Sequence, residues 1–238
     1  MLPVYRILGE LFLEAGNPRV AHHFLEIYLQ YDQQDPQAWA SLGQAHYLLG
    51  EDPSGAMQAF DKALAINKDL FSALYYRGMI YLERGEGQMA VNDLFAARTV
   101  DRESLAASLG LARALLIADR VNDAKSQFLF TLGMAEDDRQ RAEVYYYRAL
   151  ALESIGEFRE AGRDWQALLT LPADMVPQKW LDTAQEHLTL LTPTATATST
   201  PKMGTATPTK IPPSPTPTRT PSPTARRTPL PPESSLEP

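Results

Sequence analysis

The sequence contains no cysteine among its 238 residues, which excludes disulfides, thiolate catalysis and cysteine-ligated metals. This absence is compatible with either a reducing or an oxidising compartment. No apolar run approaches the roughly 18 residues that a membrane-spanning helix needs. The opening segment, MLPVYRILGELFLEAG, has no basic start, and Glu10 and Glu14 interrupt its apolar run. We therefore expect an amphipathic helix there and not a signal peptide.

Basic residues are scarce in the first four fifths of the chain. Residues 1–191 hold 17 Lys and Arg against 27 Asp and Glu, a net charge of −10. Residues 192–238 hold five basic and two acidic residues, a net charge of +3. Phosphate contacts need clustered Lys and Arg. The acidic part therefore predicts no nucleic-acid partner.

The sequence also lacks groups of residues that would form a metal site or a catalytic site. His22, His23 and Glu26 could share a metal on a helix, but adjacent histidines point to different faces and no third ligand is evident. Glu10 and Glu14 could form an acid–base pair, but no nucleophile accompanies them, and a solvated acidic face is the simpler interpretation. The sequence therefore predicts no enzyme activity, no metal site and no cofactor.

An internal repeat is the strongest feature of the sequence. Five units align on turn glycines and on the small residue of each second helix: residues 2–35, 36–70, 71–104, 105–138 and 142–175. Each unit predicts a helix of about 14 residues, a short turn and a second helix. Small residues recur at one phase of the first helices (Gly9, Gly43, Gly78, Ala112, Ala149) and of the second helices (Ala21, Ala56, Ala90, Ala124, Ala161). Small residues at facing positions let two helices approach closely.

The repeated residues resemble tetratricopeptide repeats, whose pattern of Trp, Leu-Gly, Tyr, Ala, Phe, Ala and Pro spans 34 residues. Residues 36–70 match that pattern best, with Trp39, Leu42-Gly43, Ala56 and Phe60, although His46 stands at the tyrosine position. The resemblance covers about three quarters of the chain. It implies an all-α fold in which antiparallel helix pairs stack into a right-handed superhelical solenoid.

The change of composition at Thr192 predicts two domains. Residues 1–191 form the repeat domain, and residues 176–191 make an amphipathic helix that caps the open end of the stack. Residues 192–238 hold 13 Pro and 13 Thr and almost nothing apolar to bury, so we expect a disordered tail. Such tails serve as spacers, glycosylated stalks or ligands for proline-binding domains. The missing export signal favours the cytoplasm, whereas the tail resembles those of exported bacterial proteins, so the compartment stays open.

The resemblance implies a scaffold that holds a peptide or a short helix against the concave wall built by the first helices. The positions that form this wall in the family carry Arg6, Glu10, Gln44, Tyr47, Tyr75, Met79, Leu109, Arg113, Tyr146 and Leu150. Further wall positions carry Glu14 in the first unit and Glu153 in the last. The wall therefore has an apolar and aromatic middle with acidic residues toward both ends, which predicts a protein partner with apolar and some basic residues. Packing of Tyr75 and Tyr146 between repeats is an equal alternative for these two rings. A structural surface module with the tail as a stalk is the alternative function.

Overall fold

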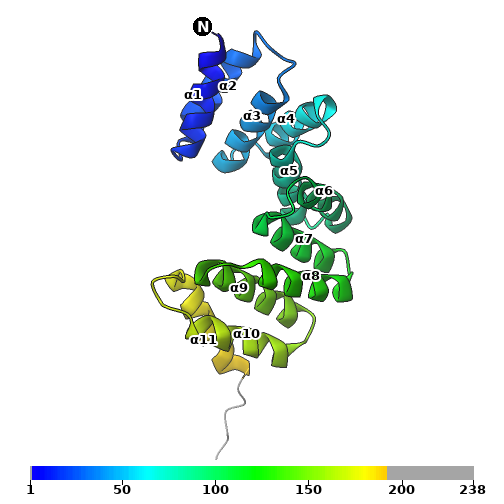
Figure 1. Ribbon diagram of the computed structural model, residues 1–238, viewed down its shortest axis with the longest axis vertical. Coiled ribbons are helices and arrows are strands. Elements are labelled where there is room, and N and C mark those ends of the chain that lie inside the picture. Colours follow the sequence, from blue (N-terminus) through cyan, green and yellow to red (C-terminus); the bar gives the residue numbers. More distant parts are fainter. Residues whose placement is uncertain (1, 192–238) are drawn as a thin grey trace, which may run out of the picture. The chain divides into compact units, whose positions relative to one another are not determined.

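The computed structural model describes residues 2–191, which form eleven α-helices and no strand (Figure 1). The helices are α1 (Leu2–Glu14), α2 (Pro18–Leu29), α3 (Pro36–Leu49), α4 (Pro53–Ile66), α5 (Phe71–Glu83), α6 (Gly87–Val100), α7 (Leu105–Ile117), α8 (Val121–Met134), α9 (Asp138–Ser154), α10 (Phe158–Thr170) and α11 (Gln178–Leu191). Within this range no helix is both long and apolar enough to cross a membrane. The predicted tail lies outside the described residues.

The helices pack in chain order. Each odd-numbered helix from α1 to α9 contacts the even-numbered helix that follows it, and each even-numbered helix contacts the next odd one. The first helices of successive units also contact each other, from α1 with α3 to α7 with α9. Contacts that link only near neighbours define a solenoid. The predicted all-α solenoid of helix pairs is therefore confirmed.

Local sequence signals explain where many helices begin and end. Asp35 and Asp52 cap α3 and α4 by accepting hydrogen bonds from backbone N–H groups, each just before a first-turn proline. The turns within units need a left-handed residue, and Gly16, Gly50, Gly85 and Gly156 supply it with φ values from 66° to 81°. In the fourth unit Asp119 takes that place at φ 58°.

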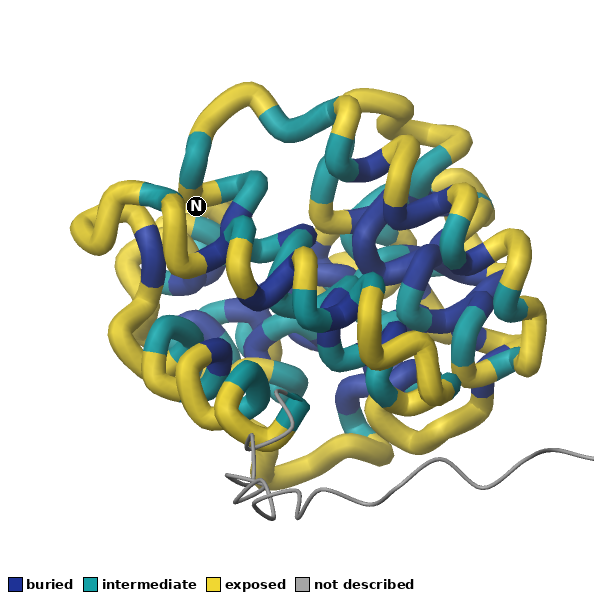
Figure 2. The backbone as a smooth tube through the Cα atoms, turned by 90° about the horizontal axis from the view of Figure 1, so that it is seen from below, coloured by how far each residue is buried: buried dark blue, intermediate teal, exposed yellow. Residues whose placement is uncertain are grey.

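The recurring small residues lie where the two helices of a unit touch. A Cβ atom on Gly43 would lie 2.6 Å from the Phe60 ring, and one on Gly78 would lie 2.7 Å from Leu94 Cγ. All five recurring alanines of the second helices are at most 1% exposed. Figure 2 shows buried and exposed segments alternating along the helices, the pattern of helices that pack on one side. The close approach predicted from the small residues is therefore present.

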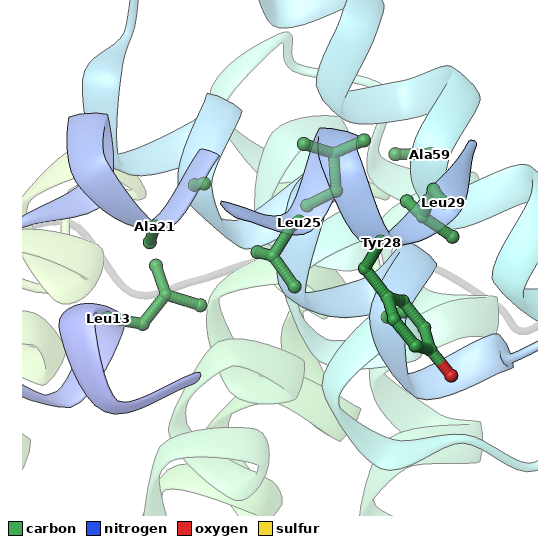
Figure 3. Packing of buried hydrophobic residues seen from close by; sticks show 9 residues of the cluster. Leu13, Ala21, Leu25, Tyr28, Leu29 and Ala59 are labelled. Carbon is green, nitrogen blue, oxygen red and sulfur yellow. The ribbon is translucent and has the colours of Figure 1, made fainter. Parts of the chain in front are cut away.

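The core is a series of clusters between neighbouring helices. At the N-terminal end Leu13 points toward Ala21, and Leu25 and Tyr28 extend the same cluster (Figure 3). At the other end α11 is held by Glu153 of α9, which accepts hydrogen bonds from Trp165 Nε1 and pairs with His187 Nδ1, both at 2.6 Å. The His187 ring is half-buried against Glu153 and Trp165.

Candidate functional site

Tyrosines of the first helices form a continuous set of contacts from α3 to α5. The Tyr47 hydroxyl donates a 2.6 Å hydrogen bond to Glu83, and Gln44 Nε2 donates one of 2.9 Å to the Tyr76 hydroxyl. The Tyr47 and Tyr76 rings are 5.4 Å apart, and the Tyr76 ring lies edge-on to Tyr75 at 5.2 Å. Burial is the largest cause that raises the pKa of Tyr47, and the hydrogen bond to Glu83 is the second. The Tyr47 hydroxyl therefore stays protonated and acts as a hydrogen-bond donor.

A second group joins α5, α7 and α9. The Arg113 guanidinium lies 4.4 Å from the centre of the Tyr147 ring, within range of a cation–π interaction. Burial raises the pKa of Glu143, and the charge of Arg113 opposes this rise. Burial also raises the pKa of Tyr75, with smaller contributions from Tyr76 and Glu143. A half-buried acid, a cation and two phenols therefore interact across three successive units.

We define the first-helix face by the half-buried residues of these two groups: Gln44, Tyr47, Tyr75, Tyr76, Arg113, Glu143 and Tyr147. Of these, Gln44, Tyr47, Tyr75 and Arg113 belong to the set predicted from sequence. Within residues 2–191 no cation lies within 4 Å of the Glu143 carboxylate, and no carboxylate lies within 4 Å of Arg113. Both charges thus keep unused hydrogen-bonding capacity at a partly solvated surface.

The predicted residues of α1 serve the fold. Arg6 pairs with Glu10 at 2.6 Å and with Asp35 at 3.4 Å. Asp35 also accepts a hydrogen bond from the Tyr28 hydroxyl, and burial together with this bond raises the pKa of Tyr28 to about 12. Arg6 and Glu10 are therefore occupied in a network that joins α1 to the turn before α3.

Other predicted residues pack against the core. Leu109 is 3% exposed in a cluster with Phe128 and Val144, so its side chain is not available to a partner. Tyr146 stacks on Trp180 with ring centres 4.7 Å apart and meets Trp165 edge-on. Met79 and Leu150 are half-buried against neighbouring clusters. For Tyr146 the alternative of packing between helices is the one that the contacts favour.

Three members of the first-helix face were missed by sequence reasoning: Tyr76, Glu143 and Tyr147. Tyr76 and Tyr147 each follow a predicted position directly, and the runs Tyr75-Tyr76 and Tyr145-Tyr146-Tyr147 were the available signal. Glu143 occupies the second position of its unit, which belongs to the family's wall. The described residues hold no group of three or more His, Asp or Glu side chains suited to a metal ion. His22 instead contacts Glu26 at 3.4 Å and the His46 ring at 4.6 Å.

Comparison with known proteins agrees with this arrangement. The sequence model of the tetratricopeptide repeat matches residues 8–70. Residues 8–70 therefore carry the sequence signature of the tetratricopeptide repeat. No curated protein sequence matches the chain.

Solved structures share this repeat fold over most of the described residues. A thermophilic tetratricopeptide repeat protein of Thermus thermophilus is 18% identical, with a TM-score of 0.61, and the match covers 79% of this chain and 100% of that one. MamA from Desulfovibrio magneticus RS-1 is 19% identical, with a TM-score of 0.60 and coverage of 71% and 93%. MamA AMB-1 is 22% identical, with a TM-score of 0.58 and coverage of 71% and 97%. At these identities the likeness concerns the fold.

Proposed function

We propose that this tetratricopeptide repeat chain is a non-catalytic protein–protein interaction scaffold that binds a peptide or a short helix on its first-helix face. The observation that carries the proposal is the group formed by Tyr75, Arg113, Glu143 and Tyr147. Rings and charges of this kind are frequent in interaction hot spots. Solenoids commonly bind along an extended surface to which every repeat contributes.

The partner is a segment with apolar anchors and some basic residues. The partly exposed rings of Tyr75 and Tyr147 offer rigid apolar contact area with a hydroxyl at the end. Glu143 offers a carboxylate that lacks a cation within 4 Å among the described residues. Because burial already disfavours its charged form, Glu143 gains from a Lys or Arg that approaches it. A structural surface module would need no such residues on this face.

The test uses the full chain and a displayed library of random dodecapeptides. We expect wild-type protein to select peptides with apolar residues and Lys or Arg. Glu143→Gln keeps the shape of the side chain and removes its charge, so it should weaken these peptides by about tenfold. Glu136→Gln, which changes an exposed carboxylate just before α9, is the matched control and should bind as wild type. Fluorescence anisotropy of the labelled peptides gives both affinities.

The pH dependence gives a second readout of the same contact. The pKa of folded Glu143 lies above the ordinary value of a glutamate, so acidification neutralises it earlier than an exposed glutamate. Affinity for the basic peptides should therefore fall as the pH is lowered toward the acidic range, and Glu143→Gln should remove this part of the fall. Peptides that bind wild type and Glu143→Gln equally at every pH would place their site elsewhere.

A further inference from the structure

The second helices of the third and fourth units enclose an open groove on another surface of the chain. α6 and α8 form its walls and α7 forms its floor. Figure 1 shows α7 between the other two helices. The groove has a volume of about 750 Å³, which lies within the usual range of ligand-binding pockets. Leu111 and Leu115 of α7 lie at its floor, and Phe95 and Phe130 line it from the two walls.

Both phenylalanines are unusually exposed for their size. Phe95 is 57% exposed and Phe130 is 50% exposed. The positions equivalent to Phe95 in the first, second and fifth units carry the polar residues Glu26, Asp61 and Gln166. The packing of a repeat therefore does not require the aromatic ring of Phe95. Clustered exposed apolar side chains beside a groove are typical of interaction sites.

Charge distinguishes the groove from the rest of this acidic domain. Arg98 lines it and lies with its guanidinium 5.0 Å from the centre of the Phe130 ring. The Arg98 guanidinium donates a hydrogen bond of 2.7 Å to the amide oxygen of Gln127. Arg102 lies beside the same two phenylalanines. Within residues 2–191 neither arginine has a carboxylate within 4 Å, so most of their N–H donors remain for a ligand.

The equivalent groove one unit further along, between α8 and α10, is narrower because an ion pair joins its walls. Between α8 and α10 Lys125 takes the place of Val91, and Glu160 takes the place of Asp123. Lys125 Nζ lies 3.2 Å from Glu157 and 3.4 Å from Glu160, so it bridges the two walls. That groove measures about 280 Å³. Among the described residues no ion pair joins the walls of the α6–α8 groove, and only the neutral Gln127 bonds Arg98 across it. Val91 cannot pair with Asp123, which instead contacts Arg120 at 2.7 Å.

We infer that the α6–α8 groove is a second binding site, which accepts a peptide segment with an apolar side chain flanked by Asp or Glu. The apolar side chain would enter between Phe95 and Phe130 and rest on Leu111. The acidic residues would pair with Arg98 and Arg102. This preference is opposite in charge to that of the first-helix face, so the two sites select different partners and do not depend on each other.

The test again pans random dodecapeptides on the full chain. The groove variant combines Phe95→Ala with Arg98→Leu, the residue type that Leu132 supplies at the equivalent place of the next unit. The matched control is Leu129→Ala, which removes the exposed side chain equivalent to Phe95 from the neighbouring groove. We expect one class of selected peptides to carry an apolar residue with acidic flanks. This class should lose about tenfold or more in affinity for the groove variant and none for the control.

A charge-reversal variant distinguishes the loss of the binding site from a loss of folding. Arg98→Glu should reject the acidic peptides and select peptides with Lys or Arg flanks, and a damaged fold could not produce this gain. Acidic peptides that bind the groove variant as tightly as wild type would overturn the inference. So would a library that yields no acidic class, or an Arg98→Glu variant with unchanged preference.

Discussion

The grooves α6–α8 and α8–α10 occupy equivalent places one unit apart, yet they are filled differently. Leu111 at the floor of the first corresponds to Arg148 in the second, and Gln127 on the wall corresponds to Asp164. Arg148 donates two hydrogen bonds, of 2.7 and 2.5 Å, to the Asp164 carboxylate. The same backbone arrangement therefore supports an open apolar groove or a narrow one that contains an ion pair.

The difference shows which positions of a repeat are free to vary. The small residues between helices are kept in every unit because larger ones would clash there. The floor and wall positions alternate instead. Arg77 with Asp93 in the third unit repeats the pair of the fifth unit, whereas Leu42 with Ala59 fills the same two places in the second. Either solution satisfies the fold. The groove with Leu111 and Gln127 measures about 750 Å³, and the groove with the Arg148–Asp164 ion pair measures about 280 Å³.

The largest expected effect comes from breaking the ion pair of the closed groove. Asp164 is 3% exposed, so Asp164→Ala leaves the Arg148 charge without its partner and should lower the free energy of unfolding by about 3–5 kcal/mol. Chemical denaturation measures this change. The double variant Arg148→Leu with Asp164→Gln copies Leu111 and Gln127 and should return to within about 1 kcal/mol of wild type. A double variant as unstable as the single one would mean that the two grooves are not interchangeable.

The second prediction concerns α8, the wall that both grooves share. Ala124 of α8 is 1% exposed against the α7 core, so Ala124→Leu overpacks this contact and should cost about 1–3 kcal/mol. Asn122→Leu adds a leucine at an exposed position of the same helix and serves as the control. Equal denaturation midpoints for the two variants would contradict the position of Ala124 between the helices.

A smaller and favourable effect is expected at the turn beside the open groove. Asp119 holds φ at 58°, where the fifth unit has Gly156. A residue with a side chain is strained in this region, so Asp119→Gly should raise the free energy of unfolding by about 0.5–1 kcal/mol. Gly156→Asp gives the reciprocal comparison and should destabilise by a similar amount. Thermal melting of both variants decides the sign.

The smallest effect is expected from the exposed phenylalanine of the open groove. Phe95→Ala should change the free energy of unfolding by less than about 0.5 kcal/mol, because the ring is largely outside the core. Phe128→Ala, in contrast, removes a ring that is 2% exposed and should cost about 3–5 kcal/mol. If Phe95→Ala were as costly as Phe128→Ala, the ring would belong to the packing of the repeat and not to a binding surface.

The fold was readable from the sequence because its signals are local. Turn glycines, first-turn prolines and small residues at helical spacing recur in each unit, and each acts within one helix pair. This regularity predicted the all-α solenoid and the match to the tetratricopeptide repeat over residues 8–70. The surface was harder, because it depends on which side chains meet across units. Tyr75 and Leu109 share one repeat position, yet Tyr75 is half-buried on the first-helix face and Leu109 is enclosed by Phe128 and Val144.

The partners of charged side chains could not be predicted either, because many of them also come from other helices. The sequence predicts a solvated acidic face for Glu10, but Arg6 pairs with it. Glu153 likewise binds Trp165 and His187, which come from other helices. Within the described residues the open groove lacks the ion pair that joins the second helices of the next groove, and no single unit reveals this difference. Sequence reasoning therefore located the first-helix face in outline and left the α6–α8 groove unnoticed.

Fluorine NMR of the full chain tests most directly the claim that the first-helix face binds a partner. Three of the seven residues that define this face are tyrosine rings of α5 and α9, whereas Phe95 and Phe130 report on the α6–α8 groove. The protein is labelled with fluorotyrosine or with fluorophenylalanine and titrated with the tightest basic peptide from the library. Single substitutions such as Tyr75→Phe and Tyr147→Phe assign the tyrosine signals. We predict shifts at Tyr75 and Tyr147 and none at Phe95 and Phe130. Shifts confined to the phenylalanines would contradict the claim.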